Sequence, residues 1–298
     1  MEKAIDFKND DYLVHALAKN SLLRCLAART TKLVGQAREI HDLSPASTVA
    51  LGRLMTGALL MAADNKNESN QLSLMTRSDG DISKMTVVCE PGGRVRGEVY
   101  QAQAPSYYHR AGKLDIGKSL GKGSLTVVKD LGLREPYVGN VDLVSGEIAE
   151  DIAAYYYYSE QVPSLVFLGV RLEPQGVLAA GGILVQVMPG ADDSLIDWLE
   201  GQAKGFPDIS QLLADKVSPH QLLELLTEEP EINYIASKKL SYYCPCSRDR
   251  MQKNLLALGK VDLEELAQDP KGINLHCHFC EKNYHFSQAE IQDIVSNK

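Results

Sequence analysis

Two pairs of cysteines, Cys244-Pro245-Cys246 and Cys277-His278-Phe279-Cys280, lie near the end of the chain with thirty residues between them. Two close pairs separated by a loop are a common way for a protein to bring four thiolates to one tetrahedral ion. Zinc is the favoured metal because it accepts four sulfurs and has no redox change of its own, whereas iron–sulfur clusters usually draw on differently spaced cysteines. The sequence therefore predicts a zinc site with Cys244, Cys246, Cys277 and Cys280 as its ligands.

The residues around these cysteines predict a small zinc-binding domain over residues 241–298. Helical patterns cover residues 248–258, 262–267 and 287–295. A domain of this size has little apolar core, so the metal should contribute on the order of 10 kcal/mol or more to its folding. Three nearby histidines are expected on the surface or in support of the ligands, because four cysteines already complete the site: His276, His278 and His285.

The segment before this domain, residues 190–240, is acidic and predicts a weakly folded linker. It carries four Lys residues against ten Asp or Glu residues, which accounts for −6 of the net charge of −8. Short apolar bursts around Leu195, Leu212 and Leu222 predict three short amphipathic helices, and helices this short depend on docking to a neighbouring surface.

Residues 1–189 predict an α+β domain of mixed sheet and helix. Ser44-Pro45 looks like an N-cap followed by proline at the first helical position, so a buried helix is expected up to Ala63. Alternating apolar residues from Leu72 to Val99, with turns at the glycines, predict an antiparallel meander. Further strands are expected at residues 125–128, 166–172 and 183–188, and a helix capped by Ser145.

Composition limits the function classes. The first residues lack the apolar core of a secretory signal, and no stretch approaches the roughly 18 apolar residues of a membrane helix, so a cytoplasmic protein without a membrane partner is expected. Six cysteines in 298 residues are too few for a disulfide framework. Cys25 and Cys89, which stand in apolar segments, are predicted to be buried and unreactive.

The cysteine cluster has two interpretations. It is either a zinc knuckle that only stabilises the fold of the last residues, or a redox sensor. Two features favour the sensor: the Cys-X-Cys spacing and the weakly folded segment before it. Sulfurs bound to zinc are thiolates, which react with oxidants, and each close pair can become a disulfide when the metal leaves. Loss of zinc would unfold the small domain and release the linker helices, exposing apolar faces that can bind other unfolded chains.

The sequence resembles the redox-regulated heat-shock holdase family, the thirty-three-kilodalton chaperonins, over nearly its whole length. The stretches that carry the resemblance are Cys244-Pro-Cys-Ser-Arg-Asp-Arg250, Cys277-His-Phe-Cys280 with Tyr284-His-Phe286, Gly146-Glu-Ile-Ala-Glu-Asp151 with Ser159-Glu-Gln161, Ala180-Gly-Gly-Ile-Leu-Val-Gln186, Leu43-Ser-Pro-Ala46 and Leu51-Gly-Arg53. Asp249 replaces a glutamate that is common in the family, a change expected to matter little.

This resemblance implies an ATP-independent chaperone that is inactive when reduced and bound to one Zn²⁺ per chain. Oxidation would form the disulfides Cys244–Cys246 and Cys277–Cys280, release zinc, unfold the linker and give a homodimer that holds unfolding client proteins. No catalytic residue is implied, so the protein is not expected to be an enzyme.

Two other classes of function remain open at this stage. A nucleic-acid-binding zinc ribbon is disfavoured because residues 241–298 hold seven Lys or Arg against eight Asp or Glu, which leaves no basic face. A thiol oxidoreductase or a hydrolase is disfavoured because no phosphate loop, Gly-X-Ser-X-Gly or His-Glu-X-X-His motif is present. His109, Asp115, Asp130 and Glu135 are expected to be scattered surface residues.

Overall fold

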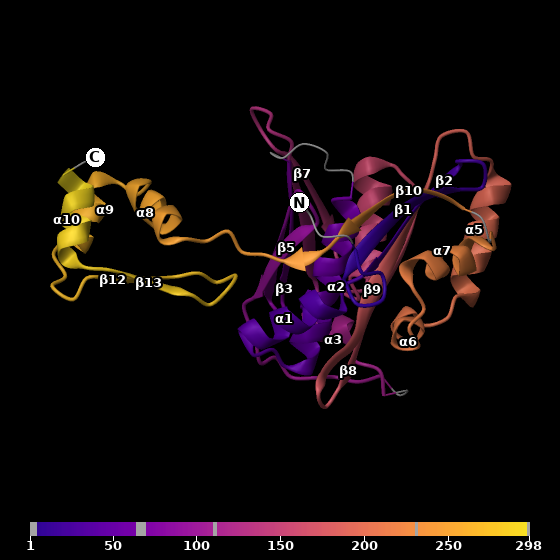
Figure 1. Ribbon diagram of the computed structural model, residues 1–298, viewed down its shortest axis with the longest axis horizontal. Coiled ribbons are helices and arrows are strands. Elements are labelled where there is room, and N and C mark those ends of the chain that lie inside the picture. The colour runs from indigo at the N-terminus through magenta and orange to yellow at the C-terminus, as the bar shows by residue number, and fades with distance from the viewer. Residues whose placement is uncertain (1–4, 64–69, 110–111, 230–231, 297–298) are drawn as a thin grey trace. The chain divides into compact units, whose positions relative to one another are not determined.

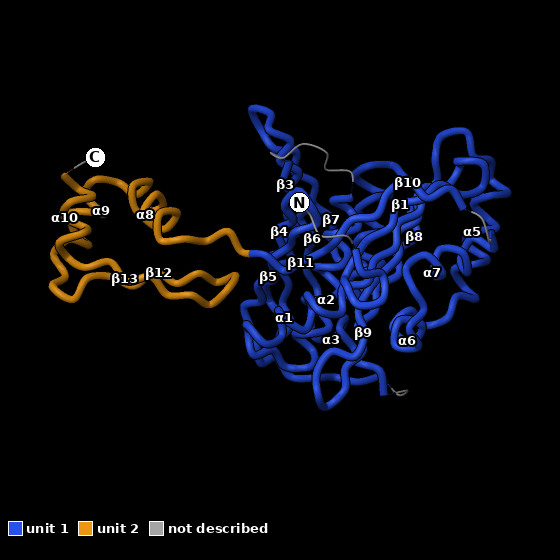
Figure 2. The backbone as a smooth tube through the Cα atoms, viewed as in Figure 1, with its two compact units in different colours: residues 1–243 blue, residues 244–298 orange. Residues whose placement is uncertain are grey.

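The computed structural model describes residues 5–63, 70–109, 112–229 and 232–296. The chain divides into two compact units, Met1–Tyr243 and Cys244–Lys298 (Figure 2). The mixture of sheets and helices confirms the predicted α+β class. The boundary between the two units lies three residues beyond the predicted start of the zinc-binding domain, and the three-part division at residues 189 and 240 stays a prediction.

The larger unit contains two sheets (Figure 1). The first has five antiparallel strands in the order β10-β1-β2-β9-β8: β1 (Tyr12–Ala18), β2 (Leu23–Arg29), β8 (Ser164–Glu173), β9 (Gly176–Val187) and β10 (Asn233–Lys239). The second has six strands in the order β11-β5-β4-β3-β6-β7: β3 (Gln71–Ser78), β4 (Lys84–Glu90), β5 (Arg94–Val99), β6 (Gly123–Asp130), β7 (Tyr137–Asp142) and β11 (Ser241–Tyr242). The predicted meander corresponds to β3, β4 and β5.

Helix α2 (Pro45–Met61) packs against strands of both sheets and forms the centre of the main core. Ser44 caps its first turn by accepting a hydrogen bond from the Ser47 amide at 3.3 Å, and Pro45 stands at the first helical position, as predicted. Every residue from Ala46 to Met61 is buried, which explains why this helix has apolar side chains all round. Helix α1 (Thr31–His41) packs beside it.

Three helices cover the opposite face of the five-stranded sheet: α5 (Asp193–Gly205), α6 (Ile209–Ala214) and α7 (Pro219–Thr227). They are the three short helices predicted for residues 190–240. Leu213 of α6 and Leu222, Leu223 and Leu226 of α7 join a second apolar core with strand residues such as Ile183. In α5 only Leu199 is buried, so α5 has far less apolar contact than α7.

The chain then returns to both sheets before it reaches the first cysteine. Strand β10 pairs with β1, and β11 pairs in parallel with β5. The Leu240 amide donates to the Asp11 carbonyl at 2.9 Å, and the Tyr242 hydroxyl donates to the Gly97 carbonyl at 3.1 Å. The end of the predicted linker therefore forms a strand at Asn233–Lys239, and Ser241–Tyr242 form another directly after it, a feature that the sequence patterns did not indicate.

The predicted N-cap at Ser145 is wrong. Helix α4 begins at Ala149, after Ile148 with a left-handed φ of 73°, and continues into the π-helical turn η1 (Tyr156–Glu160). The Asp151 carboxylate, rather than a serine hydroxyl, organises this start, because it accepts hydrogen bonds from the amides of Val144, Ser145, Gly146 and Ile148 at 2.7 to 3.2 Å. A short helix, α3 (Ile116–Leu120), precedes β6.

The smaller unit contains three helices and one hairpin. They are α8 (Arg248–Leu256), α9 (Lys260–Leu266), α10 (Gln288–Ser296) and the antiparallel pair β12 (Ile273–His276) and β13 (Asn283–Phe286). The helices match the predicted ranges to within a few residues. Their core consists of eight buried residues: Met251, Leu255, Leu263, Ala267, Cys277, Phe286, Ile291 and Ile294.

Across the described part of the chain, none of the helices combines the length and the apolar character needed to cross a lipid bilayer.

Candidate metal centre

The four predicted ligands meet in the smaller unit. Cys244 and Cys246 precede α8, while Cys277 and Cys280 lie in the turn that joins β12 to β13. Their sulfur atoms all lie within 4.8 Å of one another. The Sγ atoms of Cys244 and Cys277 are 3.6 Å apart, and those of Cys246 and Cys280 are 3.1 Å apart.

This arrangement fits a tetrahedral zinc ion. Four sulfurs at about 2.3 Å from zinc would lie about 3.8 Å from one another, close to the spacing of the four Sγ atoms here. Cys277 is buried and the other three cysteines are half-buried, so the group is shielded without being sealed from solvent. Four soft thiolates in such a cluster are the donor set of a closed structural zinc site rather than of a catalytic one, which keeps an open position.

The turn that carries Cys277 and Cys280 is fixed by its own backbone. The Cys277 amide donates to the Lys282 carbonyl at 2.9 Å, and the amides of Cys280 and Glu281 both donate to the Cys277 carbonyl, at 3.2 and 2.8 Å. Glu281 adopts a left-handed φ of 58°, which lets the chain reverse immediately after the last ligand. The pair therefore approaches the first two cysteines as a preformed loop.

Arg248 connects α8 to the hairpin and to α10. Its guanidinium donates to the His285 carbonyl at 2.6 Å and to the Glu290 carboxylate at 2.5 Å, and it lies 4.3 Å from the centre of the Phe286 ring. The sequence analysis did not assign it a role, although it stands two residues after Cys246 in the Cys-Pro-Cys-Ser-Arg stretch. Arg248 thus joins the segment after the first cysteine pair to the hairpin that carries the second pair.

The thiol groups of these cysteines differ in pKa because their surroundings differ. Burial raises the pKa of the Cys244 thiol. Burial also acts to raise the pKa of Cys246, but hydrogen bonds from the Tyr284 hydroxyl, at 3.1 Å, and from neighbouring thiols lower it to about 7. Burial and the hydrogen bond with Cys246 raise the pKa of Cys280 to about 11. Bound zinc would hold all four as thiolates, because metal binding displaces the proton.

Two of the histidines beside the cysteines bind other side chains. His276 Nε2 lies 2.8 Å from the Glu281 carboxylate, and His285 Nδ1 lies 3.0 Å from Asn274 Oδ1. The exposed ring of His278 lies near that of His276, with centroids 5.1 Å apart. The group of possible metal ligands here consists of the four cysteines.

The remaining cysteines are buried in the larger unit, as predicted. Cys25 and Cys89 are both 0% exposed. Burial raises the pKa of Cys25 to about 12 and raises that of Cys89 further. Both are therefore protonated and inaccessible, as expected for unreactive thiols.

Two residues expected to be scattered, His109 and Asp115, in fact lie together with a third, Glu147. His109, Asp115 and Glu147 each place one potential ligand atom within 4.8 Å of the others. The Asp115 carboxylate caps α3 at Lys118, and the Glu147 carboxylate accepts from the amides of Ile116 and Gly117, both at 3.0 Å. These carboxylates thus have structural partners already. Asp130 and Glu135 are exposed, as expected.

Comparison with known proteins agrees with this picture. A model of the family described as "Hsp33 protein" matches residues 11–287. The chain belongs to the Hsp33 family. It is 44% identical over 287 residues to the 33 kDa chaperonin of Acetivibrio thermocellus, covering 96% of this chain and 97% of that one. It is 43% identical over 285 residues to the 33 kDa chaperonin of Ruminiclostridium cellulolyticum, with 96% and 98% covered.

A solved structure extends the likeness to the fold. The crystal structure of the 33 kDa chaperonin (heat shock protein 33 homolog) from Thermotoga maritima matches with a TM-score of 0.88 at 32% identity, covering 97% of this chain and 99% of that one. The Hsp33 family is a family of chaperones, and the resemblance inferred from the cysteine motifs is thereby confirmed.

Proposed function

We propose that this member of the Hsp33 family is a redox-regulated, ATP-independent holdase, reduced and zinc-bound when inactive. The observation that carries the proposal is the cluster of four cysteine sulfurs within 4.8 Å of one another in a unit of its own, joined to the larger unit directly after β11. The unit has only eight buried core residues, one of which is the ligand Cys277. Its folding would then depend on the metal, by on the order of 10 kcal/mol.

Oxidation would convert the thiolates to the disulfides Cys244–Cys246 and Cys277–Cys280. Formation of each disulfide removes two electrons from a pair of thiolates, and these electrons reduce one hydrogen peroxide to two molecules of water with uptake of two protons. The sulfurs then no longer bind Zn²⁺ as thiolates, so the ion leaves and the module loses its stabilisation. A protein without a separate catalytic residue can respond to oxidant in this way.

The linker, residues 190–240, would unfold in consequence. Its helices have 13, 6 and 9 residues, and isolated helices shorter than about 12 to 15 residues are marginal in water. Undocking would expose two apolar surfaces, the leucines of α6 and α7 and the sheet face that includes Ile183 and Val185. Both surfaces are candidates for binding unfolding client proteins, and the oxidised form would pair as a homodimer in the cytoplasm.

The test is to treat the reduced protein with peroxide at heat-shock temperature while following zinc release and the aggregation of an unfolding client. Zinc release and suppression of aggregation should rise together. Cys244→Ser with Cys277→Ser should remove the control by oxidant, whereas Cys25→Ala, which changes a buried cysteine far from the cluster in sequence, should leave it intact. If zinc is released while the client still aggregates, the cluster has a structural role only and the proposed holdase function is wrong.

A further inference from the structure

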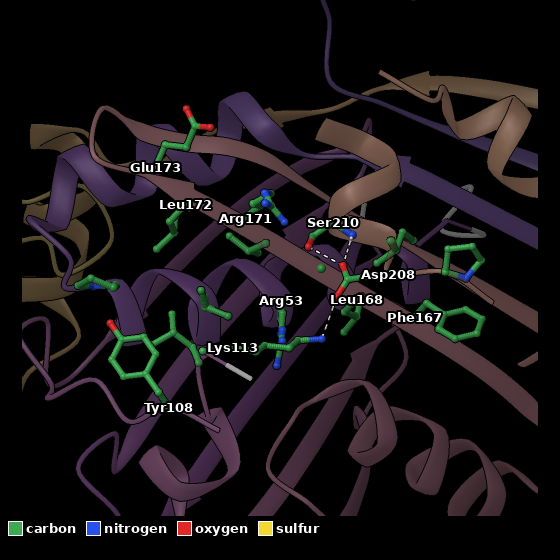
Figure 3. Close-up of a pocket in the computed structure, with 18 of the residues that line it drawn as sticks. Arg53, Tyr108, Lys113, Phe167, Leu168, Arg171, Leu172, Glu173, Asp208 and Ser210 are labelled. Atoms are coloured by element: carbon green, nitrogen blue, oxygen red, sulfur yellow. Dashed lines mark hydrogen bonds and ion pairs between the residues drawn. The ribbon is translucent and has the colours of Figure 1, made fainter. Parts of the chain in front are cut away.

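The larger unit contains an open cavity of about 830 Å³ between β8 and the loop that leads into α6 (Figure 3). Its walls come from α2, from the loop around Lys113, from residues 167–174 of β8 and its end, and from residues 206–210. Sites for small molecules commonly have volumes of about 300 to 1,000 Å³, so this cavity has room for a ligand. Neither the metal centre nor the proposed release of the linker accounts for it.

The charges around the cavity are mainly positive, although the chain as a whole carries −8. Among the described residues that line it, four are cationic and two are anionic: Arg38, Arg53, Lys113 and Arg171 against Glu173 and Asp208. Lys113 Nζ pairs with Asp208 Oδ2 at 3.0 Å, as Figure 3 shows. In the described chain, the guanidinium groups of Arg38 and Arg171 have no hydrogen bond or ion pair, so their charges are available to a ligand.

Arg53 supplies the second observation. It is only 5% exposed, and its Nη1 donates to the Glu147 carbonyl at 3.3 Å and to the Glu147 carboxylate. Its Nε is buried and has no hydrogen-bond partner. A buried donor without an acceptor costs stability, and Arg53, which lines the cavity, would recover this cost if its guanidinium turned toward a ligand oxygen there.

The rest of the wall is apolar. Val49 of α2, Leu168 and Val170 of β8, and Ile209 of α6 line the cavity. The rings of Phe167 and Phe206, which also line it, stack with centroids 5.0 Å apart. A ligand that fits both parts of the wall has a multiply charged anionic group and an apolar or planar portion.

We propose that this cavity binds a phosphate-bearing small molecule about the size of a nucleotide, its phosphate held by Arg38, Arg53 and Arg171. Guanidinium groups are suited to phosphate because their fork of donors binds two oxygens at once. Several cations around one cavity favour a group with more than one negative charge, which a phosphate carries near neutral pH and a single carboxylate does not. The apolar portion would lie against Leu168 and the two stacked phenylalanines.

The ligand would also stabilise the docked linker. Residues 206–210 form one wall, and Asp208 joins that wall to Lys113. A ligand that needs both walls binds only while α6 is docked, so binding shifts the equilibrium toward the docked state. The consequence for chaperone control rests on the proposed holdase function, but the binding itself does not.

The binding test uses the reduced full-length protein in buffer without phosphate. Adenosine 5′-monophosphate and inorganic pyrophosphate are titrated calorimetrically, with citrate as the carboxylate probe. Both phosphate probes should bind at one site, and Arg38→Ala with Arg171→Ala should weaken binding by roughly tenfold or more. Arg134→Ala, which removes an exposed arginine outside the cavity, is the matched control and should bind as the unaltered protein does.

Hydrogen exchange of α6 provides the second readout. Adenosine 5′-monophosphate, whose base can reach the wall of residues 206–210, should slow amide exchange over Ile209–Ala214 in the unaltered protein and leave it unchanged in the double variant. The proposal is overturned if neither phosphate probe saturates a site, if the double variant binds equally well, if citrate binds more tightly than both, or if exchange of α6 does not change. No oxidant is used, so these results stand apart from the success or failure of the zinc switch.

Discussion

At the scale of single residues, Asp11 shows how burial makes stability depend on pH. It is 3% exposed, its Oδ2 accepts a hydrogen bond from the Leu33 amide at 2.7 Å, and its Oδ1 has no partner. Burial raises the pKa of this carboxyl from 3.8 to about 6, against the opposing effect of the Leu33 and Lys32 amides and of Arg29. At a pH between these two pKa values, Asp11 keeps its proton in the folded state and has lost it in the unfolded state. The free energy of unfolding therefore falls as pH rises through this range.

We expect Asp11→Asn to raise the free energy of unfolding of the larger unit by about 2 kcal/mol at pH 7.5, because the side chain no longer carries a buried charge. Near pH 3.5, where the aspartate is largely protonated in both states, the variant should gain little. Denaturant unfolding followed by circular dichroism at both pH values measures the difference. Asp130→Asn, at an exposed position, is the control, and an equal gain at both pH values would contradict the assignment.

Asp151 is the opposite case, a buried carboxylate whose partners are all present. It accepts hydrogen bonds from four backbone amides and is 1% exposed. Asp151→Ala leaves these donors unpaired, so we expect a loss of about 3 kcal/mol or more in the free energy of unfolding. Glu150→Ala, at the exposed neighbouring position, should change it by less than about 0.5 kcal/mol. Similar losses in both variants would mean that the carboxylate does not organise this turn.

The sequence predicted some of the residues with special roles and missed others, and the difference has a physical reason. The four cysteines could be assigned because their thiolate chemistry and close spacing are local features. The partners of Asp11 and Glu147 lie elsewhere in the chain, about 20 to 30 residues away for the amides and 94 residues away for Arg53. No local pattern marks such a residue, and for the same reason the sequence does not indicate that His109 and Asp115 lie close together.

At the scale of elements, the docking of α6 depends on a glycine in β8. A Cβ atom at Gly169 would lie 2.7 Å from Ile209 Cγ2 and 2.8 Å from the Ser210 amide nitrogen, closer than real contacts allow. Both neighbours, Ile209 and Ser210, belong to the first turn of α6, so the glycine is needed for the close approach of helix and sheet. Gly201 in α5 differs, because a Cβ there would meet nothing within 4 Å.

We expect Gly169→Ala to displace α6 and to weaken linker docking by about 1 to 3 kcal/mol, the cost of overpacking. Hydrogen exchange should quicken over α6 and α7, and client aggregation should be suppressed at lower peroxide concentration than in the unaltered protein. Gly201→Ala, the matched control, should instead stabilise α5 by about 0.5 to 1 kcal/mol. Unchanged exchange in Gly169→Ala would show that α6 can shift without cost.

Elements with strong local signals were predicted, and those without them were missed. Helix α2 carries its cap and proline in sequence. The hairpin of β1 and β2 turns through Lys19, Asn20 and Ser21, three consecutive residues with positive φ and no glycine, so the usual turn signal is absent. Strand β10 is an edge strand with mostly exposed side chains, and its partner β1 lies more than 200 residues earlier. Its pairing has no local signature.

At the scale of the whole molecule, stability is distributed unevenly along the chain. The larger unit has a core of more than forty buried residues around α2, whereas the core of the smaller unit has eight. A small apolar core does not by itself hold a domain of 55 residues. Only Tyr243 separates β11 from Cys244. Unfolding of the smaller unit would therefore remove ordered structure directly next to β11, the strand that follows the predicted linker.

Removal of zinc should therefore unfold the smaller unit while the core of the larger unit persists. We expect a chelator at neutral pH, under reducing conditions, to make Cys244, Cys246, Cys277 and Cys280 react with iodoacetamide, as read residue by residue by mass spectrometry. Cys25 and Cys89 should stay unmodified because both are buried and burial raises their pKa. They serve as internal controls for the larger unit. Modification of all six thiols at one rate would mean that the chain unfolds as a single unit, and an oxidant could not then release the linker while the sheets remain to bind a client.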